Sequence, residues 1–521
     1  MENKEILKKC IKKGFLLDKE ILNSFKVFTE LEIEDLINKL FNLNLTERII
    51  TKNVLKNNFL KVQTLFFSLN NKKSSIEFFS KLGLNFKNLS ELDNSSDNKI
   101  NSRNNSGIVK ILAAPKILPK RIGVQDFVKH FRNRYEQLQN IFQEKSLENL
   151  KSLRRIGNER ESSFVIVSIF NKKLTKNGNL LFEVEDLTGF SRILVNKNKE
   201  ELFEKAKDIL LDEVVAFKVN GNNEILFANE LLFPESYLPE KRKHTEEELV
   251  VFTSDMHVGS TMFLEKNFLK FIKWLNGEEG DEDQRNLAKK VKYLLLTGDS
   301  VDGVGVYPGQ DKYLNIKDMK EQYKKLVEYL KLIRNDIKII LSPGQHDAVW
   351  VGEPQPIVEE EWSPGLHQIE NLTLVPNPCL VEIDGGFKIL MYHGASMHGI
   401  IEEIPEIRLN YGHDSPTRVV KEMLKRRHLS PMHGHCDYIP TEKKDNLLID
   451  IIPDIVSTGD QHRSEVSTYN NILLIASSCW QSKTPFEEKV GNNPDPCKVP
   501  IFNLKTREIK ILDFSEKEVK E

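Results

Sequence analysis

The chain has 521 residues, of which 75 are basic and 77 acidic, so that its net charge is −2, and 39% of its residues are hydrophobic. This balance is typical of a soluble globular protein of about three domains, and it excludes nucleic-acid binding through bulk charge, which leaves only local basic patches. The five cysteines are widely spaced without a Cys-x-x-Cys pair, and no apolar run is long enough to cross a membrane. We therefore expect a cytoplasmic protein without a disulfide framework and without a membrane partner.

Residues 1–87 predict a small helical domain, because apolar residues such as Ile6 and Ile11 recur near helical spacing. The next residues are rich in Asn, Ser and Asp and contain few apolar side chains. Such a composition cannot bury enough surface to become ordered. We therefore expect a flexible linker over residues 88–123.

Residues 124–240 predict an amphipathic helix followed by a small β-domain. The segment that contains Phe131 and Tyr135 carries its aromatic residues on one helical face. The period then changes to short strands, and Asn177-Gly178 between two apolar runs predicts a hairpin turn. Five short strands with one helix suit an oligonucleotide-binding (OB) type barrel, and a generic β-domain is the alternative. Four aromatic residues of these strands could stack on bases, but their alternation favours burial in the core: Phe164, Phe170, Phe182 and Phe217.

Residues 249–505 predict a layered α/β domain, because apolar strands alternate with amphipathic helices. Each of five apolar strands ends in polar residues, and ligands of such domains gather at the carboxyl ends of the strands. The charged residues 506–521 predict a C-terminal tail.

Residues that can hold metal ions or move protons follow these five strands. They are Asp255 and His257, then Asp299 with Asp302 three residues on, then Gln345, His346 and Asp347, then His393, and finally Asp460 and His462. A single residue of this kind is usually a hydrogen-bonded cap, but five in series indicate a convergent site. Mixed carboxylate and imidazole ligands suit Mn²⁺, Fe or Zn²⁺, and two ions that share a carboxylate are the usual arrangement for phosphoester cleavage.

These motifs resemble the signature of the calcineurin-like metallophosphoesterases over residues 249–505. More narrowly, KRRHLSPMHG, IIPDIVSTGD and CWQSKTPFEEKVGNNPDP resemble the small subunits of archaeal family-D DNA polymerases. The resemblance implies a multidomain α+β protein with an OB-type barrel and a four-layer α/β/β/α phosphoesterase domain. It also implies a metal-dependent 3′→5′ exonuclease that proofreads DNA with a 3′ end, in a heterodimer with the large catalytic polymerase subunit.

The resemblance implies a role for each site residue. Asp255, His257, Asp299 and His462 would hold one divalent ion, and Asp299, Gln345, His393 and Asp460 would hold a second. His346, paired with Asp347, would be the general acid.

Two residues depart from the family pattern, because Gln345 stands where the family has Asn, and Asp460 where it has His. Both changes fall on the second ion and make its site richer in oxygen, which favours Mn²⁺, with Mg²⁺ as the alternative. A partly decayed second site is the competing interpretation.

A basic run ends a predicted helix inside the phosphoesterase domain: Lys425, Arg426, Arg427 and His428. These side chains could bind a nucleic-acid backbone, or they could be a solvated helix end with favourable dipole interactions. His413, His433 and His435 lie outside the five motifs and are interpreted as structural, and His398 is left undecided.

Three functions remain open at this point. The first is the Mn²⁺-dependent 3′→5′ exonuclease subunit of a replicative DNA polymerase. The second is a catalytically weakened or inactive scaffold subunit that stabilises the large subunit. The third is a general metallophosphatase, which the five motifs alone would allow.

Overall fold

The computed structural model describes residues 3–25, 28–29, 33, 36–37, 49–51, 54, 107–115, 121–157, 159–222, 224–441 and 443–515. The chain divides into two compact units, Met1–Arg103 and Asn104–Glu521. The described elements of the first unit are α1 (Asn3–Lys12), β1 (Leu16–Leu17), α2 (Lys19–Ser24) and β2 (Ile49–Ile50). The remainder of the predicted helical domain, and the Asn- and Ser-rich part of the predicted linker, lie outside the described residues.

Two six-stranded sheets form the centre of the second unit, with strand orders β12-β11-β10-β9-β18-β19 and β16-β17-β15-β14-β13-β3. The strands of the first sheet are β9 (Leu249–Thr253), β10 (Val291–Thr297), β11 (Lys338–Ser342), β12 (Leu372–Leu374), β18 (Lys498–Asn503) and β19 (Ile509–Asp513). Those of the second are β3 (Lys110–Ala113), β13 (Cys379–Ile383), β14 (Phe387–Met391), β15 (Ile455–Thr458), β16 (Glu465–Tyr469) and β17 (Ile472–Ala476). Strands β9 to β12 are parallel, as are β14, β15 and β17, so that within each sheet these strands end at the same edge.

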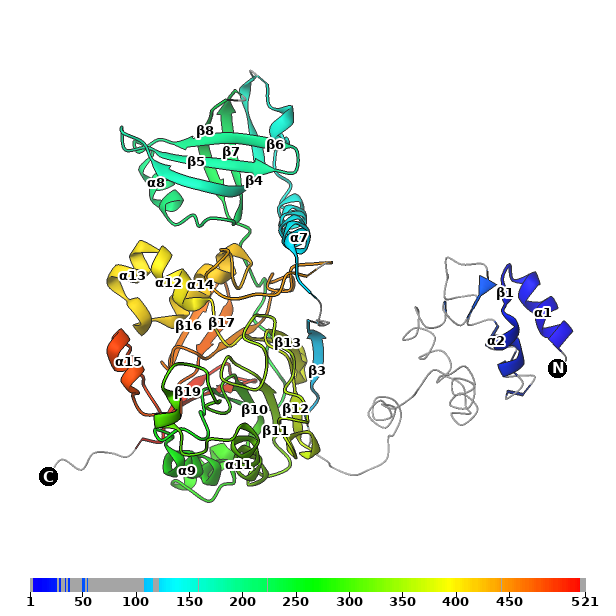
Figure 1. Cartoon of the computed structure of the whole chain (residues 1–521), viewed down its shortest axis with the longest axis vertical. Helices are drawn as coiled ribbons and strands as arrows, with labels where there is room; N and C mark the ends of the chain where they lie inside the picture. The colour runs from blue at the N-terminus through cyan, green and yellow to red at the C-terminus, as the bar shows by residue number, and fades with distance from the viewer. Residues whose placement is uncertain are drawn as a thin grey trace. The chain divides into compact units, whose positions relative to one another are not determined.

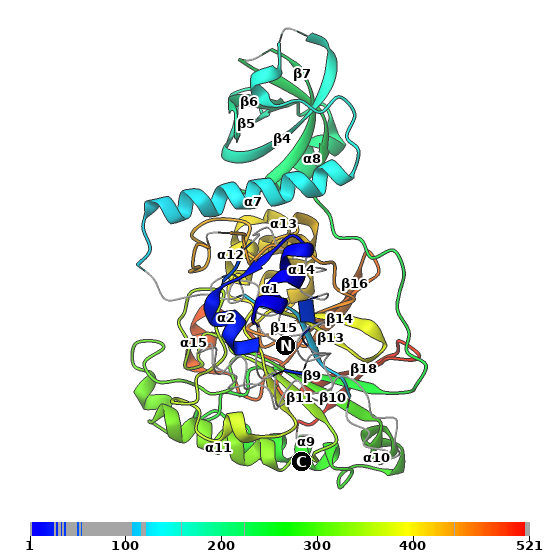
Figure 2. The same cartoon turned by 90° about the vertical axis from the view of Figure 1, so that its right-hand side faces the viewer.

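The two sheets pack face to face, and helices cover their outer faces (Figures 1 and 2). Phe252 and Leu295 of the first sheet meet Met391 and Ile475 of the second in one buried apolar cluster. The first sheet is covered by α9 (Glu265–Leu275), α10 (Glu282–Lys289) and α11 (Met319–Lys331). The second is covered by α12 (Met397–Glu403), α13 (Pro405–Asn410) and α14 (Pro416–Arg426). The predicted four-layer α/β/β/α domain is therefore confirmed. Strand β10 is buried along its whole length, as expected for a central parallel strand covered on both faces.

The β-domain is a closed barrel with strand order β4-β5-β6-β8-β7. Its elements are β4 (Glu159–Leu174), β5 (Leu180–Asp186), β6 (Gly189–Val195), α8 (Glu200–Lys207), β7 (Val214–Gly221) and β8 (Leu226–Leu232). The predicted turn joins β4 to β5, and Gly178 supplies the positive φ of 80° that such a turn needs. Three of the four aromatic residues considered for stacking, Phe164, Phe182 and Phe217, are buried, whereas Phe170 is 62% exposed.

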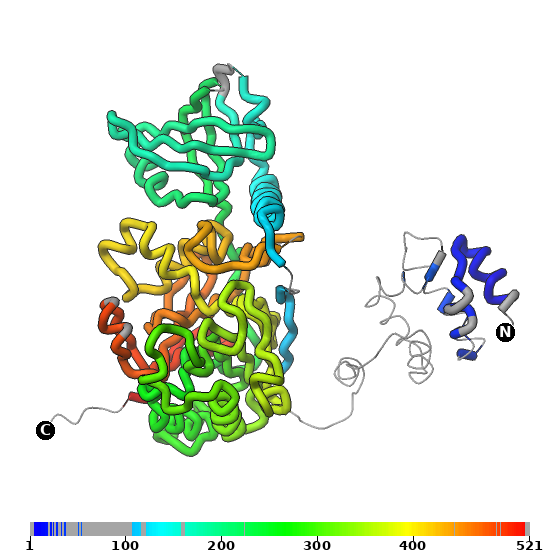
Figure 3. Tube along the Cα trace, viewed as in Figure 1, coloured from blue at the N-terminus to red at the C-terminus, as the bar shows by residue number. Residues whose placement is uncertain are grey.

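Helix α7 (Val124–Glu144) packs on the outside of the barrel. Its apolar stripe, with Leu138 and Phe142, contacts Phe164 and Ile166 of β4. Figure 3 follows the chain from the barrel through residues 233–248 into the sheets. None of the helices in the described part of the chain is both long and apolar enough to span a membrane.

Two predicted boundaries need correction. The predicted linker 88–123 contains β3, which pairs antiparallel with β13, since its backbone groups extend an edge that would otherwise be open. The predicted tail 506–521 contains β19, which pairs with β18. Phe514 follows this strand, is only 4% exposed, and packs against Trp480 and Phe271.

Candidate metal centre

The loops that follow β9, β10, β11, β14 and β15 converge on one cavity of about 530 Å³. The side chains that line it include His257, Asp299, Gln345, His346, Asp460 and His462. Asp255 and His393 are fully buried and approach these residues from below the surface. The structure thus brings together all seven residues predicted to hold metal ions.

The first group consists of Asp255, His257 and His462, whose ligand atoms lie within 4.8 Å of one another. Asp255 Oδ1 lies 3.3 Å from His462 Nε2 and 3.9 Å from His257 Nε2. The two Nε2 atoms are 3.2 Å apart. Two imidazole nitrogens that face each other at this distance beside a carboxylate form a site that suits a divalent ion.

The second group consists of Asp255, Asp299 and His393. Asp299 Oδ2 lies 3.2 Å from His393 Nε2 and 4.0 Å from the Nε2 atoms of both His257 and His346. Asp299 therefore stands between the two groups, which is the place that a bridging carboxylate requires.

Gln345 and Asp460, the two departures from the family pattern, also face the second group. Asp460 Oδ1 lies 4.0 Å from His393 Nε2 and accepts a hydrogen bond from Gln345 Nε2 at 3.4 Å. Gln345 Oε1 is buried without a hydrogen-bond partner among the described residues. Buried polar atoms are almost always satisfied, so this orphaned oxygen fits a ligand in the cavity.

The four imidazoles of the site are oriented in the same way. His257 Nδ1 lies 3.2 Å from Asp302 Oδ1, and His462 Nδ1 lies 2.7 Å from Glu487 Oε1. The Nδ1 atoms of His393 and His346 face the carbonyl oxygens of Thr297 at 3.1 Å and of Asp302 at 2.7 Å. Because each of these partners is an acceptor, each Nδ1 carries a proton and each Nε2 faces the cavity, where it can present a lone pair to an ion or, in His346, carry a second proton.

The backbone is strained at the predicted ligands. Asp255, His257, Asp299, Asp460 and His462 all adopt positive φ angles between 45° and 65°, a region that non-glycine residues rarely occupy. Such strain collects at functional sites, where the surrounding structure holds it in place.

Two glycines allow the close approach of these side chains. A Cβ atom on Gly344 would lie 2.2 Å from Asp299 Oδ1, and a Cβ atom on Gly298 would lie 2.0 Å from His393 Nδ1. The glycines of the second and third motifs are therefore required by packing within the site itself.

Electrostatics favour charged carboxylates in the cavity. Burial opposes ionisation of Asp299, but the neighbouring His393 and His346 outweigh it and hold the Asp299 pKa well below its usual value. For His393 burial acts against the charged form, yet the surrounding carboxylates raise its pKa well above the usual range. A divalent ion would take the place of the protons that this cluster of acids otherwise attracts.

His346 reaches the cavity as predicted, but its expected pairing with Asp347 needs correction. Asp347 accepts hydrogen bonds from the backbone of Ser300 and Gly344 and from the Tyr323 hydroxyl, at 3.1, 2.9 and 2.8 Å. Burial and the charge of Asp299 raise its pKa to about 6. Asp347 therefore shapes the loop, and His346 is oriented by the backbone of Asp302.

The predicted nucleic-acid contact at the end of α14 also needs correction. Arg426 is 2% exposed and forms ion pairs with Glu213 of the barrel, at 2.6 Å, and with Glu422. Arg427 and His428 are buried as well, the first against backbone carbonyls and the second against Asp445 at 2.8 Å. Lys425 pairs with Glu422 at 3.3 Å and with Asp208 at 3.8 Å. The run joins parts of this chain and leaves no cluster of free cations for DNA.

Three residues near the site were not assigned a role from sequence. Asp302 and Glu487 orient two imidazoles, and His398 lies 3.2 Å from Asp460 Oδ2. The spacing G-D-x-x-D was a signal for Asp302. The Thr-Pro-x-Glu pattern around Glu487 marks a helix start, and its capping box is present in α15 (Pro485–Val490).

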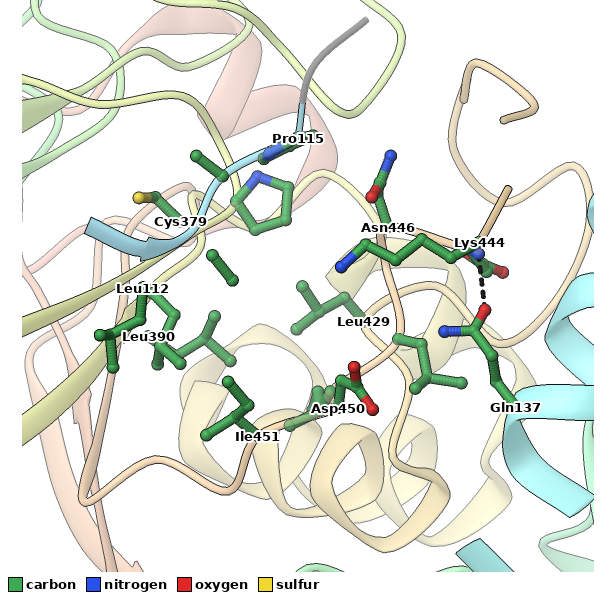
Figure 4. A pocket seen from close by; sticks show the side chains of 17 residues that line it. Leu112, Pro115, Gln137, Cys379, Leu390, Leu429, Lys444, Asn446, Asp450 and Ile451 are labelled. Carbon is green, nitrogen blue, oxygen red and sulfur yellow. Dashed lines mark hydrogen bonds between the residues drawn. The ribbon is translucent and has the colours of Figure 1, made fainter. Parts of the chain in front are cut away.

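A second cavity, of about 260 Å³, lies away from the metal centre, between β3, β13 and residues 444–451. Figure 4 shows its largely aliphatic lining, including Leu112, Leu390 and Leu429. It shares no lining residue with the metal centre, so we assign the chemistry to the cavity that holds the carboxylates and imidazoles.

Comparisons with known proteins agree with this description. The family of the B subunits of DNA polymerases alpha and epsilon matches residues 250–467. The DNA polymerase II small subunit of Methanothermobacter thermautotrophicus is 36% identical over 75% of this chain and 80% of its own length. The DNA polymerase II small subunit of Archaeoglobus fulgidus is 37% identical over 75% of this chain and 78% of its own length. The match to a solved structure of a novel archaeal phosphodiesterase covers 51% of this chain and 98% of the phosphodiesterase chain, at 16% identity. Its TM-score of 0.26 is too low to carry an argument. The chain therefore belongs to the archaeal DNA polymerase II small subunits, the small subunits of family-D DNA polymerases.

Proposed function

We propose that this chain is a metal-dependent 3′→5′ exonuclease that acts on DNA within a cytoplasmic heterodimer with the large catalytic subunit of the polymerase. The observation that carries the proposal is the convergence of Asp255, Asp299, His393 and His462 in one buried cluster. Phosphodiester hydrolysis is the reaction that such a cluster supports best. The substrate, its polarity and the partner rest on the family relationship.

Two divalent ions fit the donor set, the first held by Asp255, His257, Asp299 and His462 and the second by Asp299, Gln345, His393 and Asp460. When bound, such ions neutralise charge on the phosphate and lower the pKa of water toward neutrality. The carboxylate and amide oxygens of the second set favour Mn²⁺ or Mg²⁺ over softer ions, and we propose Mn²⁺.

His346 is positioned to protonate the leaving oxygen. Its Nδ1 donates to the carbonyl oxygen of Asp302, so Nε2 faces the cavity and can carry the transferred proton. Its ring packs edge-on against His257, with ring centroids 4.7 Å apart, which restricts its rotation. General acid catalysis of this kind contributes on the order of 10²–10⁴ in rate.

The direct test is cleavage of a 5′-labelled primer with a mismatched 3′ end by the full chain, alone and co-purified with a large polymerase subunit. We expect stepwise shortening that requires Mn²⁺, is abolished in Asp299→Asn, and falls by about 10²–10⁴ in His346→Ala. His433→Ala is the matched control, because His433 is exposed and its ring contacts Tyr438, outside the metal centre.

Equal activity in His346→Ala and the parent protein would contradict the proposal and favour the scaffold function. Preference for a phosphopeptide or a cyclic nucleotide over single-stranded DNA would instead favour the general metallophosphatase.

A further inference from the structure

His398 stands beside the second group of ligands without an assigned role. It lies on α12, the helix that begins shortly after His393. Its side chain is 52% exposed toward the cavity that it lines, and its Nε2 lies 3.2 Å from Asp460 Oδ2.

The two oxygens of Asp460 have different surroundings. Oδ1 faces the metal centre, where His393 Nε2 lies at 4.0 Å and Gln345 Nε2 at 3.4 Å. Oδ2 faces away from it and accepts a hydrogen bond from Gln461 Nε2 at 2.7 Å. His398 Nε2 lies 3.2 Å from both Oδ2 and Gln461 Nε2, and in its Nε2–H tautomer it donates to Oδ2 as well. One oxygen is thus left for an ion, and the other is held by this chain.

Asp460 needs such a restraint because its carboxylate can turn, as an imidazole ligand does not. An imidazole in this position presents one lone pair in a fixed direction, whereas a carboxylate can rotate about χ2 and present either oxygen or both. A hydrogen bond to the outer oxygen removes this freedom, as outer partners commonly do for metal ligands.

The helix that carries His398 is rigidly placed. Met397, Ile400 and Ile401 are buried in the core below the second sheet. Gly399 packs so closely against His435 that a Cβ atom would lie 2.2 Å from His435 Nδ1. The position of the His398 backbone is therefore set by the packing of α12.

A further layer supports the arrangement. Gln461 Oε1 lies 2.7 Å from His413 Nδ1, and the rings of His398 and His413 are 4.9 Å apart. Gln461 therefore joins His413 to the outer oxygen of Asp460.

We propose that His398 is a positioning residue that makes Asp460 a competent ligand of the second metal ion. This inference rests on the metal centre of the proposed function. It assigns the second site a fifth participant, which acts through Asp460 and does not itself bind the ion.

The experiment is a titration of the full chain with Mn²⁺ alone, in which binding is measured by calorimetry and by the electron paramagnetic resonance signal of free Mn²⁺. We expect His398→Ala to lower the affinity for one ion by about 10–100-fold and to leave the affinity for the other unchanged. His398→Gln, whose Nε2 can still donate to Oδ2, should recover most of the affinity. Glu403→Gln is the control, because Glu403 is an acidic residue of the same helix that pairs with His435.

A double-mutant cycle separates positioning from direct ligation. If His398 acts only through Asp460, its removal should have no further effect in an Asp460→His background. An equal loss from His398→Ala in both backgrounds, or an equal weakening of both ions, would overturn the proposal. So would a parent protein that binds fewer than two ions. Two tightly bound ions without DNA cleavage would contradict the exonuclease function and leave the role of His398 intact.

Discussion

His393 Nε2 lies 3.2 Å from Asp299 Oδ2, although these residues follow strands of different sheets, β14 and β10. The metal centre is therefore built across the two sheets and depends on how closely they approach each other at this edge. Gly344 lies at the same point, since its Cβ position is 2.2 Å from Asp299 Oδ1 and 2.7 Å from His393 Nε2.

Gly344→Ala should therefore displace the bridging carboxylate without unfolding the protein. We expect DNA cleavage to fall by about 100-fold, because a displacement of the order of 1 Å at a catalytic group has an effect of this size. The measurement is single-turnover cleavage together with thermal melting. In the control Gly352→Ala the new Cβ meets nothing closer than 3.5 Å, so both quantities should stay near the parent values. Full activity in Gly344→Ala would contradict the described packing.

Glu487→Gln should lower the affinity of the site formed by Asp255, His257, Asp299 and His462 for its metal ion. Glu487 Oε1 lies 2.7 Å from His462 Nδ1, and its charge strengthens His462 as a ligand. Removal of the charge should lower Mn²⁺ affinity or activity by about 10–100-fold, measured by metal titration. The adjacent exposed Glu488 gives the control variant Glu488→Gln. Equal affinities in the two variants would show that Glu487 does not support His462.

Arg426→Met should destabilise the junction between the barrel and the phosphoesterase domain. It leaves the buried carboxylate of Glu213 without its partner, and loss of one member of a buried ion pair costs about 3–5 kcal/mol. Urea unfolding should show this loss, and a second change, Glu213→Leu, should recover part of it. DNA affinity, measured beside a Lys421→Met control, should not change. Unaltered stability with weaker DNA binding would restore the nucleic-acid role predicted from the basic run.

Stability should decrease in acid because of the cluster around Asp445. Burial, aided by the charge of Arg134, lowers the pKa of His428 from 6.5 to about 4. Ser430 N donates to His428 Nδ1 at 3.0 Å, which fits the neutral imidazole. The unfolded chain therefore binds a proton at higher pH than the folded one, so the contribution of His428 is complete above about pH 6.5 and is lost as pH falls toward 4.

Urea unfolding between pH 7 and pH 4 should show a loss of roughly 3 kcal/mol from His428, which His428→Gln should remove. His433→Gln, at an exposed position, is the control. A pH dependence that is the same in His428→Gln and the parent protein would contradict this assignment.

The layered domain and its ligands could be predicted because their signals are local. Apolar strands such as β9 and β10 end directly before Asp255 and Asp299, and parallel strands place their ends at a common edge. The edge strands β3 and β19 could not be predicted in the same way. β3 pairs with β13, which is distant in sequence. β19 forms a hairpin with the preceding β18, but its charged residues have the composition of a tail.

The basic run of α14 shows a second limit. A series of cations at a helix end has the same sequence pattern whether it faces solvent, DNA or buried acids. Its partners, Glu213 for Arg426 and Asp445 for His428, come from the barrel and from a loop after the helix. Only the folded contact distinguishes the three cases. The wrong pairing of His346 with Asp347 has a similar origin, because neighbouring residues in a tight loop point in different directions.

In the proposed metal centre one cavity holds two divalent ions that share Asp299. Titration of the full chain with Mn²⁺ near neutral pH, read by calorimetry, counts these ions. We expect two ions per chain for the parent protein and loss of tight binding of both in Asp299→Asn. One ion or none in the parent, or two ions that remain tightly bound in Asp299→Asn, would contradict this arrangement.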